Sequence, residues 1–231
     1  MDAIKLALSV NLQSDFHTGT GYGIKGQADS MQMLDQRQPV IPRREFRGAL
    51  RDRLEYLVRD LYPWFGVCDG RYTGAGDRLC GVTPQLGSDA EPCPVCRIFG
   101  SPYTPRGFDF ADLRPPGGAE LVAQPHVKID PKRGRAEGDF LFSIQVARST
   151  EALTSTIEET PEHQQYPGPI RRLDALLLVG ALRLLRRLGG KQRRGLGRCV
   201  IEVELKPAEL GDLAAAIGEL RKELQACTPT A

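Results

Sequence analysis

The chain has little of what marks a membrane or secreted protein. None of its apolar runs approaches the roughly 18 residues that a bilayer-spanning helix requires. The first residues, Met1 to Ala3, lead directly into an alternating pattern, without a basic cluster and apolar stretch, so we expect no secretory signal. We therefore expect a cytoplasmic protein without a membrane partner, in a compartment where disulfide bonds are rare.

A large excess of charge is also missing. The net charge of the 231-residue chain is only +2, so overall charge does not indicate a nucleic-acid-binding protein. The 31 basic residues nevertheless divide into 24 arginines and 7 lysines. Because the guanidinium group binds phosphate through two hydrogen bonds and stacks on bases, local arginine-rich sites are candidates for nucleic-acid contact. No internal repeat or low-complexity segment is found.

The most informative segment is a glycine-rich basic loop at 188–198, between a predicted helix and a predicted strand. Its glycines and basic residues are Gly189, Gly190, Lys191, Arg193, Arg194, Gly195, Gly197 and Arg198. Glycines can bring backbone N–H groups close to phosphate oxygens while arginines neutralise the charge. The order helix, loop, strand matches neither the P-loop nor the dinucleotide fingerprint. The loop therefore favours a polynucleotide backbone as ligand, and a ligand-free basic turn is the alternative.

Hydrophobic periodicity predicts an α+β fold with large insertions. We expect strands at 4–12, 108–113, 121–129, 139–146 and 199–205, helices at 43–58, 170–188 and 208–225, and a polar loop at 150–168. The order strand, helix, strand, strand, helix, strand is that of a ferredoxin-like fold. The RNA-recognition (RRM-like) scaffold has the same order, and its open sheet binds single strands.

Residues 62–105 show no clear period and read as a small insertion without its own core. They contain four cysteines, namely Cys68, Cys80, Cys93 and Cys96. Four thiolates suit a tetrahedral, structural Zn²⁺, which would hold such a segment together. The alternative is that Cys93 and Cys96 are ordinary small apolar residues. Cys199 and Cys227 lie elsewhere and are not expected to be ligands.

Three segments, in this order, resemble the RAMP superfamily. They are Phe-His-Thr-Gly-Thr-Gly at 16–21, Val-Ile-Pro with Phe-Arg-Gly-Ala-Leu-Arg at 40–51, and Arg-Gly-Leu-Gly-Arg at 194–198. Length and the long loop after the first strand are similar to the backbone subunits of type III CRISPR effector complexes. This resemblance implies a finger–palm–thumb protein whose copies line up along a guide RNA, with other subunits, and cut the paired target RNA. It implies one domain over 1–231, a zinc-binding insertion at about 62–105 and a thumb-like hairpin at about 121–147.

The resemblance also implies a catalytic aspartate between the first strand and the first helix. Asp29, in Gly-Gln-Ala-Asp-Ser at 26–30, matches that position. Its carboxylate would hold Mg²⁺ or Mn²⁺, which polarises a phosphate and supports attack by a 2′-hydroxyl. A solvated turn aspartate is the alternative reading. Asp15 and Asp35 share the loop, and Asp35 is the next candidate.

Basic residues outside the glycine loop complete the expected guide-RNA contacts. They are Arg43, Arg44, Arg47 and Arg51 on the first helix and Lys128, Lys132 and Arg133 on the hairpin. Arg43, Arg44 and Glu45 depart from the Gly-Ser-Ser typical of the family.

Three other functions stay open at this stage. The chain could be a structural subunit with an inert Asp29. It could be a metal-independent guide-processing nuclease with His17 as general base. It could also be an unrelated zinc-stabilised interaction module.

Overall fold

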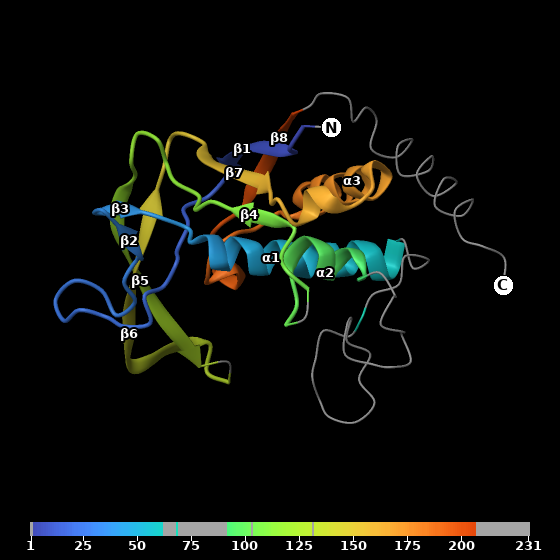
Figure 1. Ribbon diagram of the computed structural model, residues 1–231. Helices are drawn as coiled ribbons and strands as arrows, with labels where there is room; N and C mark the ends of the chain where they lie inside the picture. Colours follow the sequence, from blue (N-terminus) through green and yellow to red (C-terminus); the bar gives the residue numbers. More distant parts are fainter. Residues whose placement is uncertain (1, 62–67, 69–91, 103, 131, 207–231) are drawn as a thin grey trace.

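The computed structural model describes residues 2–61, 68, 92–102, 104–130 and 132–206 (Figure 1). Three sequence-based expectations lie outside these residues: most of the insertion at 62–105, the ligand Cys80 within it, and the helix at 208–225. No helix in the described part is long and apolar enough to cross a bilayer.

A four-stranded antiparallel sheet forms the centre of the fold. Its strands are β1 (Lys5–Leu12), β4 (Phe108–Phe110), β7 (Leu153–Glu159) and β8 (Cys199–Lys206), in the spatial order β4-β7-β1-β8. Helices α1 (Arg43–Tyr56) and α3 (Gly168–Leu184) lie on one side of this sheet (Figure 1). The expected α+β class is confirmed, and these six elements follow the order strand, helix, strand, strand, helix, strand.

The expectation of a polar loop at 150–168 is wrong, because strand β7 lies there and pairs with both β1 and β4. Leu153 and Ile157 are fully buried, as in an ordinary strand. The same buried face also carries Ser155 and Glu159, two polar residues that conceal the alternation in the sequence. Glu159 can be buried because distant residues donate hydrogen bonds to its carboxylate.

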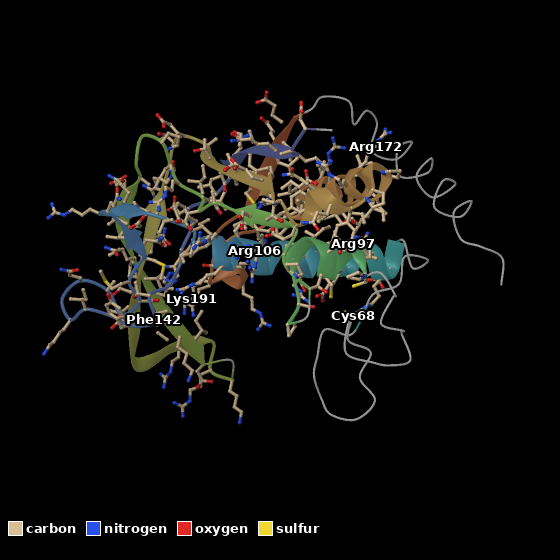
Figure 2. The ribbon with its side chains drawn as sticks, in the orientation of Figure 1. Cys68, Arg97, Arg106, Phe142, Arg172 and Lys191 are labelled. Carbon is tan, nitrogen blue, oxygen red and sulfur yellow. The ribbon has the colours of Figure 1, made fainter. Side chains whose placement is uncertain are left out.

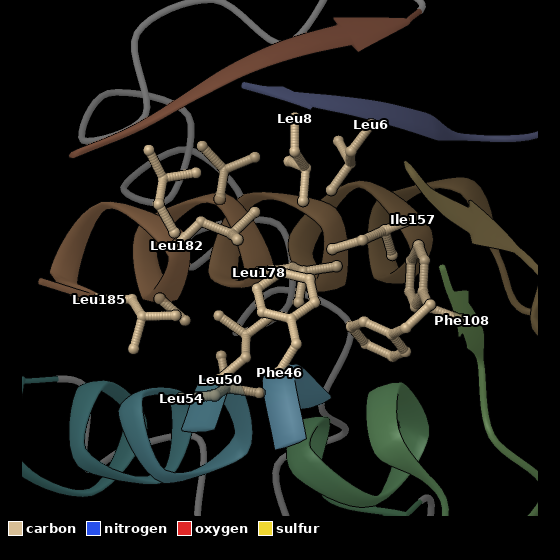
Figure 3. Close-up of a cluster of buried hydrophobic side chains, with 14 of the residues drawn as sticks. Leu6, Leu8, Phe46, Leu50, Leu54, Phe108, Ile157, Leu178, Leu182 and Leu185 are labelled. Carbon is tan, nitrogen blue, oxygen red and sulfur yellow. The ribbon is translucent and has the colours of Figure 1, made fainter. Parts of the chain in front are cut away.

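The core fills the space between the sheet and the helices (Figure 3). β1 contributes Leu6 and Leu8, whose side chains point toward α3 because alternate residues of a strand share a face. α1 begins after Pro42, whose fixed φ suits a helix start, and it buries residues one turn apart such as Phe46 and Leu50. Complete burial of one such side chain contributes about 1.5–3 kcal/mol.

Two element boundaries differ from the predicted ones. α1 continues into a π-helical turn (Leu57–Leu61), and α3 ends at Leu184 rather than at residue 188. Helix α2 (Pro94–Phe99) falls inside the expected coreless insertion, yet its Val95 and Ile98 are buried in the main core. The last part of that segment therefore belongs to the central fold.

A long hairpin of β5 (Glu120–Asp130) and β6 (Arg135–Arg148) forms a separate two-stranded sheet beside the central one (Figure 1). The predicted hairpin is confirmed, with longer strands than expected. One face packs Ile144 and Val146 against Leu196 of the glycine-rich loop. The remaining short elements are the strand pair β2 (Leu34–Asp35) and β3 (Gln38–Pro39) and the 3-10 turns His163–Gln165 and Gln192–Arg194.

Candidate functional site

Three segments that are distant in sequence meet beside the sheet: the loop 14–33, the β5–β6 hairpin and the glycine-rich loop 188–198. The loop 14–33 lies alongside β6, because Phe16 pairs with Ala147 and Ser30 pairs with Ile144 through backbone bridges. The glycine-rich loop contacts the loop 14–33 through the N–H of Gly190, which donates to the carbonyl oxygen of His17 at 2.6 Å. These contacts assemble one continuous surface from all three segments.

The glycines of the loop 188–198 serve the fold itself. Gly197 has φ +73°, and a Cβ at this position would lie 1.8 Å from the carbonyl oxygen of Leu188. The N–H groups of Gly190, Gly195 and Gly197 all donate to carbonyl oxygens within the protein. These three N–H groups are therefore satisfied within the fold, and contact of the loop glycines with RNA stays a prediction.

The basic side chains of the same loop face solvent. Lys191, Arg193, Arg194 and Arg198 are all exposed, and none of them takes part in an ion pair within the described part of the chain. The guanidinium group of Arg194 lies 4.5 Å from the ring centroid of Phe142 on β6, a cation–π contact that links the loop to the hairpin. Figure 2 shows Lys191 and Phe142 in this region. Four cations without carboxylate partners can neutralise phosphate groups.

The arginines of α1 divide between different surroundings. Arg43, Arg44 and Arg47 are exposed, whereas Arg51 pairs with Glu55 one turn later, at 2.9 Å. With 3.6 residues per turn, Arg47 and Arg51 lie on the flank opposite Ala49 and Arg53. It is the Ala49 and Arg53 flank that faces the end of α3 and the glycine-rich loop. The structure therefore does not place Arg47 and Arg51 beside that loop.

The expected basic residues of the hairpin lie at its far end. Lys128, Lys132 and Arg133 are exposed, close to the turn that connects β5 and β6. Arg133 approaches Asp130 at 3.7 Å, an exposed pair of small energetic value. These cations lie apart from the central sheet, where the hairpin projects from the fold (Figure 1).

Asp29 is exposed and held against the hairpin. Its Oδ2 accepts hydrogen bonds from the N–H of Ser143 at 2.7 Å and from the Ser143 hydroxyl at 3.1 Å. These bonds lower the pKa of Asp29, so it is ionised at neutral pH. Within the described part no cation pairs with it, and it belongs to no group of three or more potential metal ligands. A divalent ion there would be held by one carboxylate together with substrate phosphates, an arrangement that Mg²⁺ accepts.

The other two aspartates of this region are neutralised by arginines. Asp15 pairs with Arg148 through two contacts of 3.1 Å, and Asp35 pairs with Arg114. A carboxylate that is already paired with arginine is a poor ligand for a divalent cation. Of the three, Asp29 is thus the carboxylate whose chemistry fits metal binding best.

His17 is a structural residue in this geometry. The side chain is 1% exposed, with Nδ1 2.7 Å from the carbonyl oxygen of Gln145 and Nε2 3.1 Å from the hydroxyl of Ser30. A carbonyl only accepts, so Nδ1 carries the proton and Nε2 accepts from Ser30. Burial lowers the pKa of His17 and keeps the ring neutral. Both nitrogens therefore order the loop 14–33, and neither faces a substrate.

Three of the four expected zinc ligands lie together. The sulfur atoms of Cys68, Cys93 and Cys96 lie within 4.8 Å of one another, with Sγ–Sγ distances of 3.4 Å from Cys68 to Cys96 and 3.8 Å from Cys93 to Cys68. Zn–S bonds of about 2.3 Å place tetrahedral thiolates about 3.8 Å apart, so this spacing fits zinc. In the described part these cysteines form the only group of three or more potential metal ligands. Cys199 is buried in the core, apart from them.

The open face of the sheet carries acids rather than aromatic rings. Ser9 lies opposite Glu202, Ala7 lies opposite Glu204, and Lys5 pairs with Glu158. The aromatic residues of β4, Phe108 and Phe110, point into the core. A sheet face that binds single-stranded RNA needs stacking rings and positive charge. Among the described residues the strands of this face expose no aromatic ring, and Lys5 is paired with Glu158. The cations gather instead on the glycine-rich loop, α1 and the hairpin.

Sequence reasoning also missed a buried ionic network. His163 bonds both Glu159, at 2.7 Å from Nδ1, and Asp174, at 3.0 Å from Nε2. Arg171 and Arg97 each donate two bonds to these carboxylates, Arg171 to Glu159 and Arg97 to Asp174. Arg97 directly follows Cys96 in α2, so the network joins the cysteine cluster to α3 and β7. The residues lie too far apart along the chain to show as a pattern.

A family model described as the RAMP superfamily matches residues 10–200. The chain belongs to the RAMP superfamily. The match includes the loop 14–33, α1, the hairpin and the glycine-rich loop, that is, every segment that forms the surface described above. RAMP proteins bind CRISPR RNA and form complexes, and some are RNA endonucleases, so this chain is a CRISPR-associated RNA-binding protein. No curated protein matches the chain.

Proposed function

We propose that this RAMP protein is a backbone subunit of a type III CRISPR effector complex, which holds guide RNA and cleaves paired target RNA. One observation carries the proposal. The glycine-rich loop, the loop 14–33 and the hairpin form one surface. The first segment carries cations that form no ion pair among the described residues, and the second carries an ionised, exposed carboxylate. Cations would hold the guide backbone, while Asp29 would act on the strand paired with it.

Asp29 would hold a divalent cation, Mg²⁺ or Mn²⁺, together with the scissile phosphate. The ion would supply charge stabilisation at the phosphate. The protein's part is to keep the carboxylate ionised and fixed in place, and the two hydrogen bonds from Ser143 do both.

The architecture supports the same assignment. The order β4-β7-β1-β8, with α1 and α3 on one side, is consistent with a ferredoxin-like palm, and the β5–β6 hairpin is consistent with a thumb. The cysteine cluster is consistent with a zinc-bearing variety, in which Cys68, Cys93 and Cys96 bind a structural Zn²⁺ with Cys80 as the fourth ligand. We propose a cytoplasmic location, in line with this role.

The test is cleavage of a labelled target RNA by the protein assembled with guide RNA and Mg²⁺ or Mn²⁺. The wild type should cut at regular intervals, and Asp29→Ala should abolish cutting while guide binding survives. Asp35→Ala is the matched control, because it removes an arginine-paired carboxylate from the same region. Loss of cleavage in Asp35→Ala alone would transfer the catalytic role to Asp35.

Three alternative functions give different outcomes in measurements of cleavage and RNA binding. A purely structural subunit would bind guide and target RNA, and neither the wild type nor the variants would cut the target. A guide-processing nuclease would cut without metal and would lose activity in His17→Ala. The burial of His17 and the engagement of both ring nitrogens argue against that second alternative. A zinc-stabilised interaction module would show no salt-dependent RNA binding.

A further inference from the structure

A cavity of about 430 Å³ lies between α1 and the chain that follows α3. Its apolar lining consists of Ala49, Leu184 and Leu185. Its polar lining consists of Asp52, Arg53, Arg186, Arg187 and Gln192. The volume is within the range of about 300–1,000 Å³ that is typical of ligand pockets. Three arginines around one cavity suit an anion.

Most of the positive charge here is not neutralised within the described residues. Arg53 pairs with its neighbour Asp52 at 3.2 Å, and these side chains are 45% and 71% exposed, so the pair is weak. Arg187 donates one N–H to the carbonyl oxygen of Gln192 at 2.8 Å, which leaves its other donors for a ligand. Arg186 is exposed and takes part in no ion pair in the described part. The lining of the cavity thus contains three arginines and one carboxylate, that of Asp52.

The cavity is continuous with the basic glycine-rich loop. Gln192 lines the cavity and also begins the 3-10 turn that carries Arg193 and Arg194. Arg187 forms a backbone bridge with Arg198 at the other end of the loop. An RNA strand that lies along the exposed basic side chains of the loop would therefore reach the cavity without a gap in positive charge.

We infer that this cavity binds a backbone phosphate of the bound RNA, with Arg53, Arg186 and Arg187 as its ligands. The inference rests on the proposed RNA-binding function and extends the RNA path from the glycine-rich loop along the edge between α1 and α3. Arginine is suited to the role because its planar group offers several donors to phosphate oxygens. None of these three arginines belongs to the sites expected from the sequence.

The experiment measures binding of a fluorescent single-stranded RNA at several salt concentrations. The double variant Arg53→Gln with Arg186→Gln removes two cations and keeps Arg187, whose backbone contact supports the loop. Arg183→Gln is the matched control, because Arg183 is an exposed arginine of α3 that does not line the cavity. Thermal unfolding of each variant checks that the fold is intact.

The double variant should weaken RNA binding severalfold and reduce the slope of log affinity against log salt by about 0.7 for one lost phosphate contact. Arg183→Gln should leave that slope unchanged. An unchanged slope in the double variant, or an equal loss in Arg183→Gln, would overturn the cavity as a phosphate site while RNA binding by the wild type still stands. Absence of salt-dependent binding in the wild type would instead overturn the proposed function.

Discussion

Asp29 and Ser143 are joined by reciprocal hydrogen bonds between the loop 14–33 and β6. The Ser143 N–H and hydroxyl both donate to Asp29 Oδ2, and the Asp29 N–H donates to the Ser143 carbonyl oxygen at 3.0 Å. The carboxylate is thereby held against β6 of the hairpin although it belongs to a long loop. The pKa of Asp29 is lowered chiefly by the backbone bond and secondarily by the hydroxyl.

Ser143→Ala should slow target cleavage without abolishing it. The variant loses the hydroxyl donor and keeps the backbone donor, so the carboxylate is held less firmly and the cleavage rate should fall severalfold. Guide binding should not change. Since the hydroxyl helps to lower the pKa of Asp29, its loss should also shift the acid limb of the pH–rate profile to higher pH. Rates measured across acidic pH for the wild type and the variant test both effects.

Ser149→Ala is a suitable control, because among the described residues the hydroxyl of Ser149 bonds only backbone atoms of its own turn, at Glu151. It should leave both the rate and the acid limb unchanged. An acid limb that stays in place in Ser143→Ala would show that Asp29 does not limit the reaction.

The sequence predicts elements whose buried face is apolar, and it misses the one whose buried face is mixed. β1 alternates cleanly and is predicted correctly, whereas β7 buries Ser155 and Glu159 and reads as a loop. The acid at Glu159 is stabilised by Arg171 and His163, which come later in the chain. Only the folded structure shows that this burial is compensated.

The candidate site, too, can be predicted only in part from the sequence. In the sequence, Asp15, Asp29 and Asp35 are three similar loop aspartates. They differ because Arg148 and Arg114 neutralise Asp15 and Asp35, from 133 and 79 residues away. The exposed cations of the glycine-rich loop could be predicted because they are adjacent in sequence. Arg53 and Arg186 could not, since folding alone brings α1 to the end of α3.

Gly197→Ala should disrupt the glycine-rich loop, whereas Gly195→Ala should not. Both glycines have positive φ, so each substitution carries the left-handed cost of about 1–2 kcal/mol. At Gly197 the new Cβ would also collide with the Leu188 carbonyl, while at Gly195 nothing lies within 4 Å. We expect Gly197→Ala to lower the free energy of unfolding by about 3 kcal/mol or more. Denaturant unfolding of both variants measures this, and equal losses would refute the close approach at Gly197.

His163→Gln should destabilise the protein most at low pH. Burial alone would lower the pKa of His163, but hydrogen bonds from the imidazolium to Asp174 and Glu159 outweigh it and raise the pKa above its ordinary value of 6.5. A raised pKa gives stability that is complete below about pH 6.5 and is lost as pH rises through the folded-state value. The variant should therefore lose about 1–3 kcal/mol near pH 6 and less at alkaline pH.

Unfolding of the wild type and His163→Gln over about pH 5–9 tests that dependence. Glu159 does not interfere in this range, because hydrogen bonds from Arg171 and His163 overcome its burial and lower its pKa to about 2. The stability that Glu159 contributes is lost as the pH falls from about 4.5 toward about 2, which is below that range. A constant difference between wild type and variant across the range would mean that His163 stays neutral in the fold.

Removal of metal should unfold the region of the cysteine cluster. Without an ion, hydrogen bonds with Cys68 and Cys93 and then burial raise the pKa of Cys96, whereas Zn²⁺ would hold the sulfurs as thiolates. We expect one zinc per chain by metal analysis, and loss of it, with a lower Tm, in Cys93→Ser or after chelation. Cys227→Ser, which changes no expected ligand, should keep the metal. Full zinc content in Cys93→Ser would exclude Cys93 as a ligand.

Arg97 should couple that cluster to the central fold. Its guanidinium donates to both oxygens of Asp174 at 2.7 Å, and the Asp174 side chain is fully buried. Arg97→Met leaves this carboxylate without its arginine, which should cost about 3–5 kcal/mol in free energy of unfolding. Arg106→Met breaks an exposed pair with Asp109 and should cost at most about 1 kcal/mol. If Arg97→Met with Asp174→Asn restores most of the loss, the uncompensated buried charge is its cause; if the double variant is no more stable, the loss comes from packing of α2 instead.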